Sequence, residues 1–193
     1  MQAGRIGPNA ILQLVDVLER RGEAELCRAV LAEAGVARPP RDAGMLPEAD
    51  CAAVHQALRR LSPAAEALLA EAGLATGDYI LAHRIPKMAQ VVLRLLPGGV
   101  AAPVLTKAIA KHAWTFAGTG EFRVESGRPL VLSVACNPLV AGWRAERPQC
   151  VWHVSVFQRL YGRLVWPEVV VREVACCACG DAVCRFELSS AAM

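Results

Sequence analysis

Cysteine is the residue type with the clearest chemical potential in this sequence, and it is concentrated near the C-terminus. Five of the eight cysteines fall in the last 44 residues, at positions 150, 176, 177, 179 and 184. Thiolates gathered at a turn, with Gly180 permitting a tight backbone reversal, are typical of a tetrahedral Zn²⁺ site. Cys150 can supply a further sulfur from upstream. The segment therefore favours a zinc knuckle, although its spacing differs from the paired Cys-x-x-Cys of a zinc ribbon.

Two other interpretations of the same cysteines stay open. Cysteine is among the most buried residue types, so the cluster can be a set of free thiols packed in a turn of small residues. The run Cys176-Cys177-Ala178-Cys179 also contains a Cys-x-x-Cys, and a thiol left outside a metal site can be redox active. The sequence shows no neighbouring cation or helix terminus that would activate one particular thiolate, which disfavours the redox interpretation.

Helices dominate the predicted elements of the first half of the chain. Apolar residues recur at helical spacing over seven ranges: 9–21, 23–34, 47–61, 62–72, 76–84, 87–96 and 103–116. Gly73 is expected to end the fourth of these helices, which Ser62 caps and Pro63 opens. Residues 37–47 carry three prolines and form the best candidate linker.

Strand patterns begin after Gly118. Residues 121–125 and 130–135 predict a hairpin with its turn at 127–129, and ranges 168–175 and 182–188 predict two strands that flank the clustered cysteines. Residues 150–163 fit a helix. The expected fold class is α+β, with N-terminal helices followed by an antiparallel sheet packed on helices and a zinc knuckle near the C-terminus.

Composition excludes several classes of protein. The chain has 193 residues, 54% of them hydrophobic and 20% charged, which argues against intrinsic disorder. The net charge of +3 comes from scattered basic residues, so we expect no nucleic-acid partner. No apolar run is long enough for a membrane span, and residues 1–10 lack the apolar core of a signal peptide. We therefore expect a cytoplasmic protein whose cysteines serve metal or redox chemistry rather than disulfides.

Motifs for a bound redox cofactor are missing from the sequence. There is no Gly-x-Gly-x-x-Gly after a strand, no phosphate-binding loop, no Cys-x-x-Cys-His and no ferredoxin-type cysteine spacing. A reductase would need a separate electron source. The residues alone therefore favour a protein that binds or carries a hydrophobic ligand, leave catalysis undecided and identify no catalytic residue.

The last part of the chain carries a recognisable pattern. Glu173-Val-Ala-Cys176, then Gly180, then Cys184-Arg-Phe186 is similar to the signature of the 4-vinyl-reductase domain, a small-molecule-binding module. The whole chain resembles the J-protein family of bacteriochlorophyll biosynthesis, whose members are called 4-vinyl reductases. The resemblance implies a helical N-terminal region over 1–72 and a ligand-binding domain over 73–193, or one continuous domain.

The resemblance also implies a metal site. Aromatic-sensing regulators with the same domain bind zinc through three cysteines and a glutamate, and by position these ligands are Cys150, Glu173, Cys176 and Cys184. With four protein ligands the zinc would be structural. Cys179 remains an alternative to Glu173 as the fourth ligand, and Arg172 and Arg185 are expected to offset the negative charge of the site.

A fold of helices over a sheet that encloses an apolar cavity, which this domain class implies, suits a flat tetrapyrrole. Histidine is the natural axial ligand for a magnesium tetrapyrrole, and His112 and His153 lie nearest to the aromatic residues of the second half, although a surface or core histidine is the commoner case. Several aromatic residues can stack on the ring or simply fill the core: Trp143, Trp152, Phe157, Tyr161 and Trp166. Arg123 and Arg144 are candidates for the pigment propionates.

Three functions remain in competition. The favoured one is a tetrapyrrole-binding protein that holds or delivers magnesium-divinyl intermediates for reduction of the 8-vinyl (C4 vinyl) group and assists other bacteriochlorophyll-pathway enzymes. The alternatives are direct reduction of that vinyl group with a separate electron donor, and a sensor module for a small aromatic. A homodimer is left open.

Overall fold

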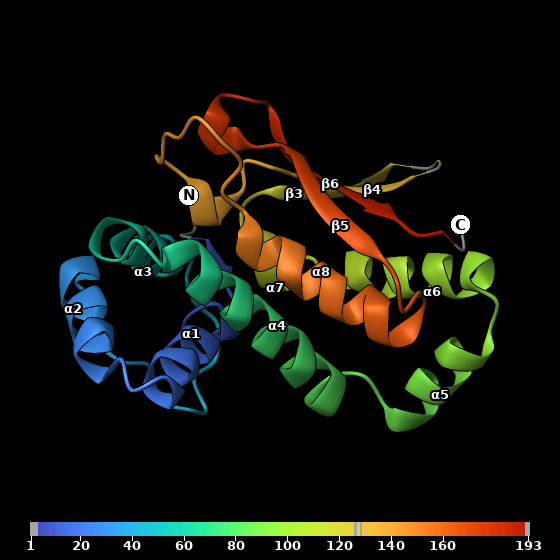
Figure 1. The fold of residues 1–193 in the computed structure, drawn as a ribbon, viewed down its shortest axis with the longest axis horizontal. Helices are drawn as coiled ribbons and strands as arrows, with labels where there is room; N and C mark the ends of the chain where they lie inside the picture. The colour runs from blue at the N-terminus through green and yellow to red at the C-terminus, as the bar shows by residue number, and fades with distance from the viewer. Residues whose placement is uncertain (1–3, 126, 128, 192–193) are drawn as a thin grey trace.

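The computed structural model describes residues 4–125, 127 and 129–191, and it has the expected α+β order of helices followed by an antiparallel sheet (Figure 1). The helices that precede the sheet are α1 (Asn9–Arg20), α2 (Ala24–Ala34), α3 (Glu48–Leu61), α4 (Ala65–His83), α5 (Lys87–Leu95), α6 (Gly98–Lys111) and α7 (Trp114–Ala117). Over the described residues, no helix combines the length and the hydropathy that crossing a bilayer would require.

The sheet contains four antiparallel strands in the order β3-β4-β6-β5. They are β3 (Glu121–Glu125), β4 (Leu130–Ala135), β5 (Val170–Ala175) and β6 (Val183–Ser189). The predicted β3–β4 hairpin is confirmed, with Phe122 opposite Val134, while part of its predicted turn lies outside the described residues. Along β6 the buried side chains alternate at Cys184, Phe186 and Leu188, so one face of this central strand belongs to the core.

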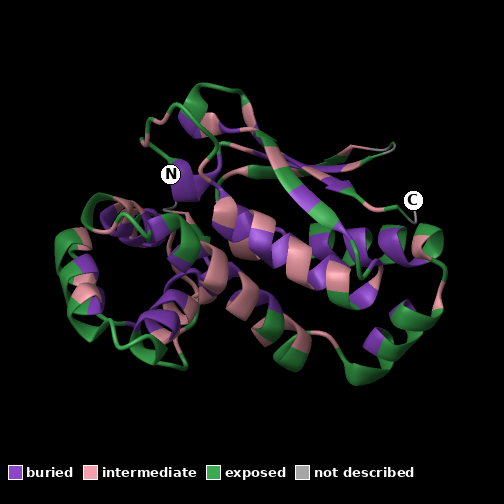
Figure 2. Ribbon diagram, in the orientation of Figure 1, coloured by how far each residue is buried: buried purple, intermediate pink, exposed green. Residues whose placement is uncertain are grey.

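Helix α8 (Val151–Leu164) packs across the inner face of the sheet, where the rings of Phe157 and Phe186 lie 5.4 Å apart in an edge-to-face contact. The helix carries an unbroken run of buried side chains at positions 155–157. Figure 2 shows the buried residues gathered between α8 and the strands. The core of the C-terminal half is thus a helix against a sheet, as the sequence predicts.

Helix α4 runs beside α8 and continues through the position where the sequence predicts a stop (Figure 1). The prediction that Gly73 ends a helix is wrong, and so is the separate helix over 76–84. A Cβ atom at Gly73 would lie 2.4 Å from the carbonyl oxygen of Trp152, and one at Gly77 would lie 2.6 Å from Cβ of Arg159. These glycines therefore serve close packing of α4 on α8 rather than a turn. The predicted boundary at 72/73 falls inside α4.

The N-terminal helices form a lobe at one end of the molecule (Figure 1). The predicted hairpin of α1 and α2 is confirmed, and α2 ends at Gly35 in the left-handed conformation. The predicted linker leads into a two-residue strand, β2 (Leu46–Pro47), which pairs with β1 (Arg5–Ile6). Two-residue strands are too short to give an alternating pattern, so the sequence did not reveal them. Helix α6 begins at Gly98 rather than at Pro103, which lies inside it.

Candidate metal centre

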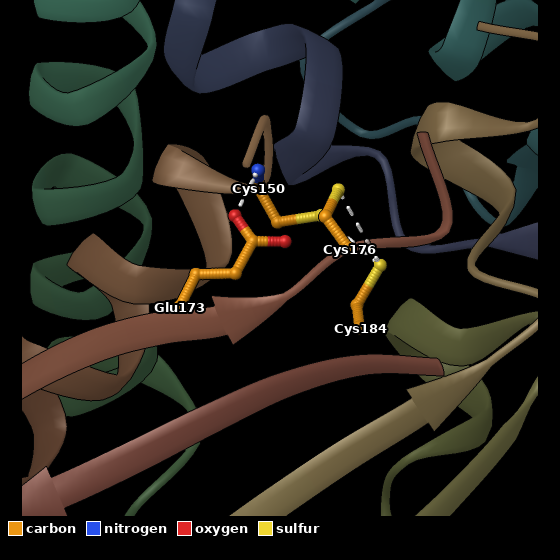
Figure 3. Close-up of side chains that lie close together, drawn as sticks. All are labelled: Cys150, Glu173, Cys176 and Cys184. Atoms are coloured by element: carbon orange, nitrogen blue, oxygen red, sulfur yellow. Dashed lines mark hydrogen bonds between the residues drawn. The ribbon is translucent and has the colours of Figure 1, made fainter. Parts of the chain in front are cut away.

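Four side chains from three elements meet at one end of the sheet (Figure 3). Cys150 precedes the first turn of α8, Glu173 lies on β5, Cys176 follows β5 and Cys184 lies on β6. One potential ligand atom from each residue lies within 4.8 Å of all the others. The structure therefore brings together the four residues that the family resemblance singled out.

The distances within this cluster fit a tetrahedral ion. The three sulfur-to-sulfur distances are 3.4 Å between Cys150 and Cys184, 3.9 Å between Cys150 and Cys176, and 4.0 Å between Cys176 and Cys184. Zinc at about 2.3 Å from each sulfur would place tetrahedral thiolates about 3.8 Å apart. Oε2 of Glu173 accepts a hydrogen bond from the backbone N–H of Cys150 at 2.6 Å. Among the described residues, its buried Oε1 has no hydrogen-bond partner, so this oxygen is free to act as a ligand.

Backbone and amide N–H groups hold the sulfurs in place. The backbone N–H of Cys177 donates to Sγ of Cys184 at 3.3 Å, and Nδ2 of Asn137 donates to Sγ of Cys150 at 3.3 Å. The short helix η2 (Cys177–Cys179) and Gly180, at φ +97°, reverse the chain between β5 and β6. Such donors orient thiolates and stabilise their charge. Asn137 was missed in the sequence, since its position before η1 (Pro138–Val140) gives no sign that it faces a cysteine.

Burial makes the cluster unfavourable for several negative charges in the absence of a cation. It raises the pKa of Glu173 from 4.5 to about 8. A hydrogen bond with Cys176 raises the pKa of Cys150, whereas hydrogen bonds from Cys150 and then Cys184 lower the pKa of Cys176. One thiolate is thus stabilised by the protons of its neighbours. Ionising the whole set requires a bound cation, which is the condition under which thiolates serve as ligands.

Arg59 of α3 is the basic residue that supplements this centre. Its guanidinium donates to the carbonyl oxygen of Gln149 at 2.5 Å, directly before Cys150, and its buried Nη1 has no hydrogen-bond partner among the described residues. Burial lowers the pKa of Arg59, and the negative charges of Cys150, Cys176 and Glu173 oppose that shift. No pattern in the sequence marks this residue, which lies about ninety positions from Cys150 along the chain.

The expected role of Arg172 and Arg185 is corrected by the structure. Arg172 is exposed, and Arg185 forms an ion pair with Glu125 of β3. Neighbouring residues on a strand point to opposite faces of the sheet. Because Glu173 and Cys184 face the cluster, the arginines beside them in the sequence face away from it.

The remaining clustered cysteines lie outside the group of four. Cys179 ends η2 with an exposed side chain, and Cys177 is half-buried. Cys136 is exposed and has a positive φ of 50°.

The two candidate pigment ligands lie in different environments. His153, in the first turn of α8, is buried, and neither of its ring nitrogens has a hydrogen-bond partner among the described residues. Burial lowers its pKa from 6.5 to about 3, so the imidazole is neutral. His112 is exposed at the end of α6, with Nδ1 2.9 Å from the carbonyl oxygen of Ala108.

Aromatic rings surround His153. Its ring centroid lies 5.0 Å from Trp152, 5.8 Å from Phe186, 6.1 Å from Phe116 and 6.3 Å from Phe157. These side chains come from α7, α8 and β6, so the imidazole is enclosed between helix and sheet.

The other proposed pigment contacts lie elsewhere in the structure. Tyr161 and Trp166 stack on each other in the core at 6.1 Å, and the Tyr161 hydroxyl bonds that of Thr106. Arg123 pairs with Glu121, and Arg144 is exposed. An open hollow of about 780 Å³ lies along α1 and α4, and neither His112 nor His153 lines it.

Comparisons with known proteins identify the family. Residues 130–190 match the 4-vinyl-reductase domain. The bacteriochlorophyll synthase 23 kDa chain of Cereibacter sphaeroides is 58% identical over 187 residues, covering 96% of this chain and 91% of that protein. The protein of the same name from Rhodobacter capsulatus is 58% identical over 186 residues, covering 95% and 86%.

Solved structures with little sequence identity share the fold. An Fe(II) unliganded H-NOX protein from K. algicida has a TM-score of 0.58 at 9% identity, covering 95% of this chain and 96% of that one. The phenol-responsive sensory domain of the transcription activator PoxR, solved with phenol, has a TM-score of 0.53 at 14% identity, covering 86% and 90%. The sequence similarity along nearly the whole length shows that the chain belongs to the family of the bacteriochlorophyll synthase 23 kDa chain, with a 4-vinyl-reductase domain in its C-terminal part.

Proposed function

We propose that this chain is a metal-stabilised tetrapyrrole-binding protein of bacteriochlorophyll biosynthesis. It binds magnesium-divinyl intermediates and holds or delivers them where the 8-vinyl (C4 vinyl) group is reduced, in concert with other enzymes of the pathway. Membership of the bacteriochlorophyll synthase 23 kDa family supports the pathway. The likeness in fold to a phenol-binding sensory domain supports a small molecule as the ligand.

The observation that carries the pigment proposal is His153. A buried imidazole without a hydrogen-bond partner is costly unless another group uses its nitrogen. Its lowered pKa keeps the nitrogen lone pair available, and neutral imidazole is the form that binds metals. The surrounding aromatic side chains suit the faces of a flat ring. A pigment would reach His153 by separating it from Phe116, whose side chain is only half-buried.

The proposed metal is structural Zn²⁺ held by Cys150, Glu173, Cys176 and Cys184. Three thiolates and one carboxylate suit its preference for sulfur with one harder ligand. Four protein ligands leave no open position for water or substrate, so the ion would tie α8 to β5 and β6 and supply no catalysis. Arg59 would offset part of the charge of −2 that zinc with these four ligands carries.

The test is an absorbance titration of a magnesium-divinyl tetrapyrrole into purified, zinc-loaded protein, with no reductant present. We expect a saturable shift of the Soret band at about one pigment per chain, lost in His153→Phe and retained in His112→Ala. Phenylalanine conserves the aromatic packing, and exposed His112 makes the matched control. No shift with the wild-type protein would contradict the proposal.

The same material separates the enzyme from the carrier. Stoichiometric binding without turnover supports delivery of the pigment. NADPH-dependent loss of the vinyl group, catalysed by the purified chain alone, would instead assign direct reduction to it. Saturable binding of a small aromatic in place of the pigment would assign a sensor.

A further inference from the structure

Helices α5 and α6 expose an apolar surface that the rest of the fold does not cover. On α5, Met88 is 74% exposed and Leu95 is 80% exposed, with Val91 and Val92 about half exposed between them. These four positions follow i, i+3, i+4 and i+7, so they line one face of the helix. Val100 and Val104, both 51% exposed, extend the apolar residues onto α6. We call these six side chains the α5–α6 face.

The helix that bears most of this face is held firmly from behind. Gln90 and Leu93 are its buried residues, and Nε2 of Gln90 donates to the carbonyl oxygens of Leu81 and Ile85 at the end of α4. Figure 1 places α5 at the end of the molecule opposite the α1–α3 lobe, and Figure 2 shows it largely exposed. The apolar side chains are therefore presented outward from a fixed helix.

Positive charge surrounds the α5–α6 face. Residues 79–120 contain five cations and no acidic residue: Arg84, Lys87, Arg94, Lys107 and Lys111. All five are exposed, and within the described part of the chain none of them lies in an ion pair. Removing these five from the 21 basic residues leaves 16 against 18 acidic residues. The rest of the chain is thus slightly negative, and the charge distribution points one end of the molecule toward an anionic surface.

We propose that the α5–α6 face docks on the surface of a bilayer that contains anionic phospholipids. An amphipathic helix with lysines beside its apolar face lies in the interface, where apolar side chains enter the acyl boundary and cations reach the headgroups. Exposed Trp114, shortly after α6, is a residue type favoured at that depth. The protein would bind on the membrane without spanning it.

Lysine usage favours lipid over a protein as the partner. The chain has 18 arginines and only three lysines, and all three lysines are on α5 or α6. Protein interfaces are depleted in lysine and enriched in arginine. Long lysine side chains instead extend from an apolar surface to keep their ammonium groups among phosphates and water.

Vesicle flotation tests the proposal with the full chain. We expect binding to vesicles of phosphatidylcholine with one-third phosphatidylglycerol, and much weaker binding to phosphatidylcholine alone or at high salt. The double variant Met88→Ser/Leu95→Ser should lose at least about tenfold of the partition constant, since two apolar anchors are removed. Lys107→Glu/Lys111→Glu should lose at least about tenfold on the anionic vesicles.

Matched variants control for fold and for net charge. Val124→Ser/Val170→Ser removes two exposed valines of the sheet, and Arg28→Glu/Arg144→Glu makes the same change of charge elsewhere. Both should bind within about twofold of the wild-type protein, with melting temperatures measured for all. Absence of binding to the anionic vesicles, or equal binding by Met88→Ser/Leu95→Ser, would overturn the proposal. So would self-association in the absence of lipid that this variant abolishes, which would assign the face to a second copy of the chain.

Discussion

At the scale of single residues, the cluster at Cys150 is distinguished from ordinary buried thiols by what surrounds its sulfurs. Sγ of Cys150 accepts from the side-chain amide of Asn137, and Sγ of Cys184 accepts from the backbone N–H of Cys177. Donors of this kind gain little from neutral thiols, which are weak acceptors, and stabilise thiolates. The residues therefore favour a metal centre over free cysteines.

Replacing one sulfur ligand should release the metal and destabilise the fold. We expect Cys176→Ser and Cys184→Ser each to lose zinc, because the free energy of binding is also free energy of folding. A loss of at least about 3 kcal/mol would lower the melting temperature by about 6 to 12 °C for a chain of this length. Metal analysis and calorimetry check this. Cys136→Ser, at an exposed thiol away from the cluster, should keep both metal and stability; unchanged metal content in the first two variants would exclude the proposed ligands.

Burial of His153 predicts a dependence of stability on pH. Its pKa falls from 6.5 to about 3 on folding, so the unfolded chain takes up a proton below pH 6.5 that the folded chain does not. The stability is present above the unfolded pKa and is lost as the pH falls. From pH 7 to 5.5 this residue alone should cost about 1 kcal/mol of unfolding free energy.

Urea unfolding of the wild-type protein and His153→Phe over that pH interval measures this contribution. The variant keeps an aromatic ring and loses no hydrogen bond, while His55, buried with a similarly lowered pKa, is common to both proteins. Parallel curves for the two proteins would show that His153 does not stay neutral in the folded state.

At the scale of elements, the contact between α4 and α8 depends on glycines in a helix interior. Glycine is less favourable than alanine there by about 1 kcal/mol, so close packing must offset that cost. We expect Gly73→Ala to destabilise the protein by about 1 to 3 kcal/mol, because its Cβ would press on the Trp152 carbonyl. Gly99→Ala on α6 is the matched control, since no atom lies within 4 Å of its added Cβ. A Gly73→Ala variant as stable as the wild-type protein would contradict this account of the α4–α8 packing.

The same glycines show where sequence patterns are informative and where they fail. The strands of the sheet and helix α8 follow from local alternation and helical spacing, because each buries one face against the core. Gly73 resembles a helix stop because local preferences cannot reveal that another helix passes close by. The pairing of β1 with β2 is likewise a contact between distant segments, without a pattern of its own.

At the scale of the whole molecule, the candidate centre is a long-range construction. The cysteine cluster was visible in the sequence, since three of its four proposed ligands lie between positions 173 and 184. Arg59 and Asn137 could not be predicted, because each reaches the site through tertiary packing of α3 or of the segment after β4. The resemblance to a family supplied Glu173, for which residue type alone gave no preference over Cys179.

The most direct test of the account is zinc K-edge X-ray absorption on protein purified without added metal or chelator, with Glu173→Gln and Cys179→Ser alongside. We predict one zinc per chain with three sulfur ligands at about 2.3 Å and one oxygen at about 2.0 to 2.2 Å. The spectrum should change in Glu173→Gln and not in Cys179→Ser. A wild-type protein without stoichiometric metal would contradict the account, as would a four-sulfur spectrum that Cys179→Ser alters.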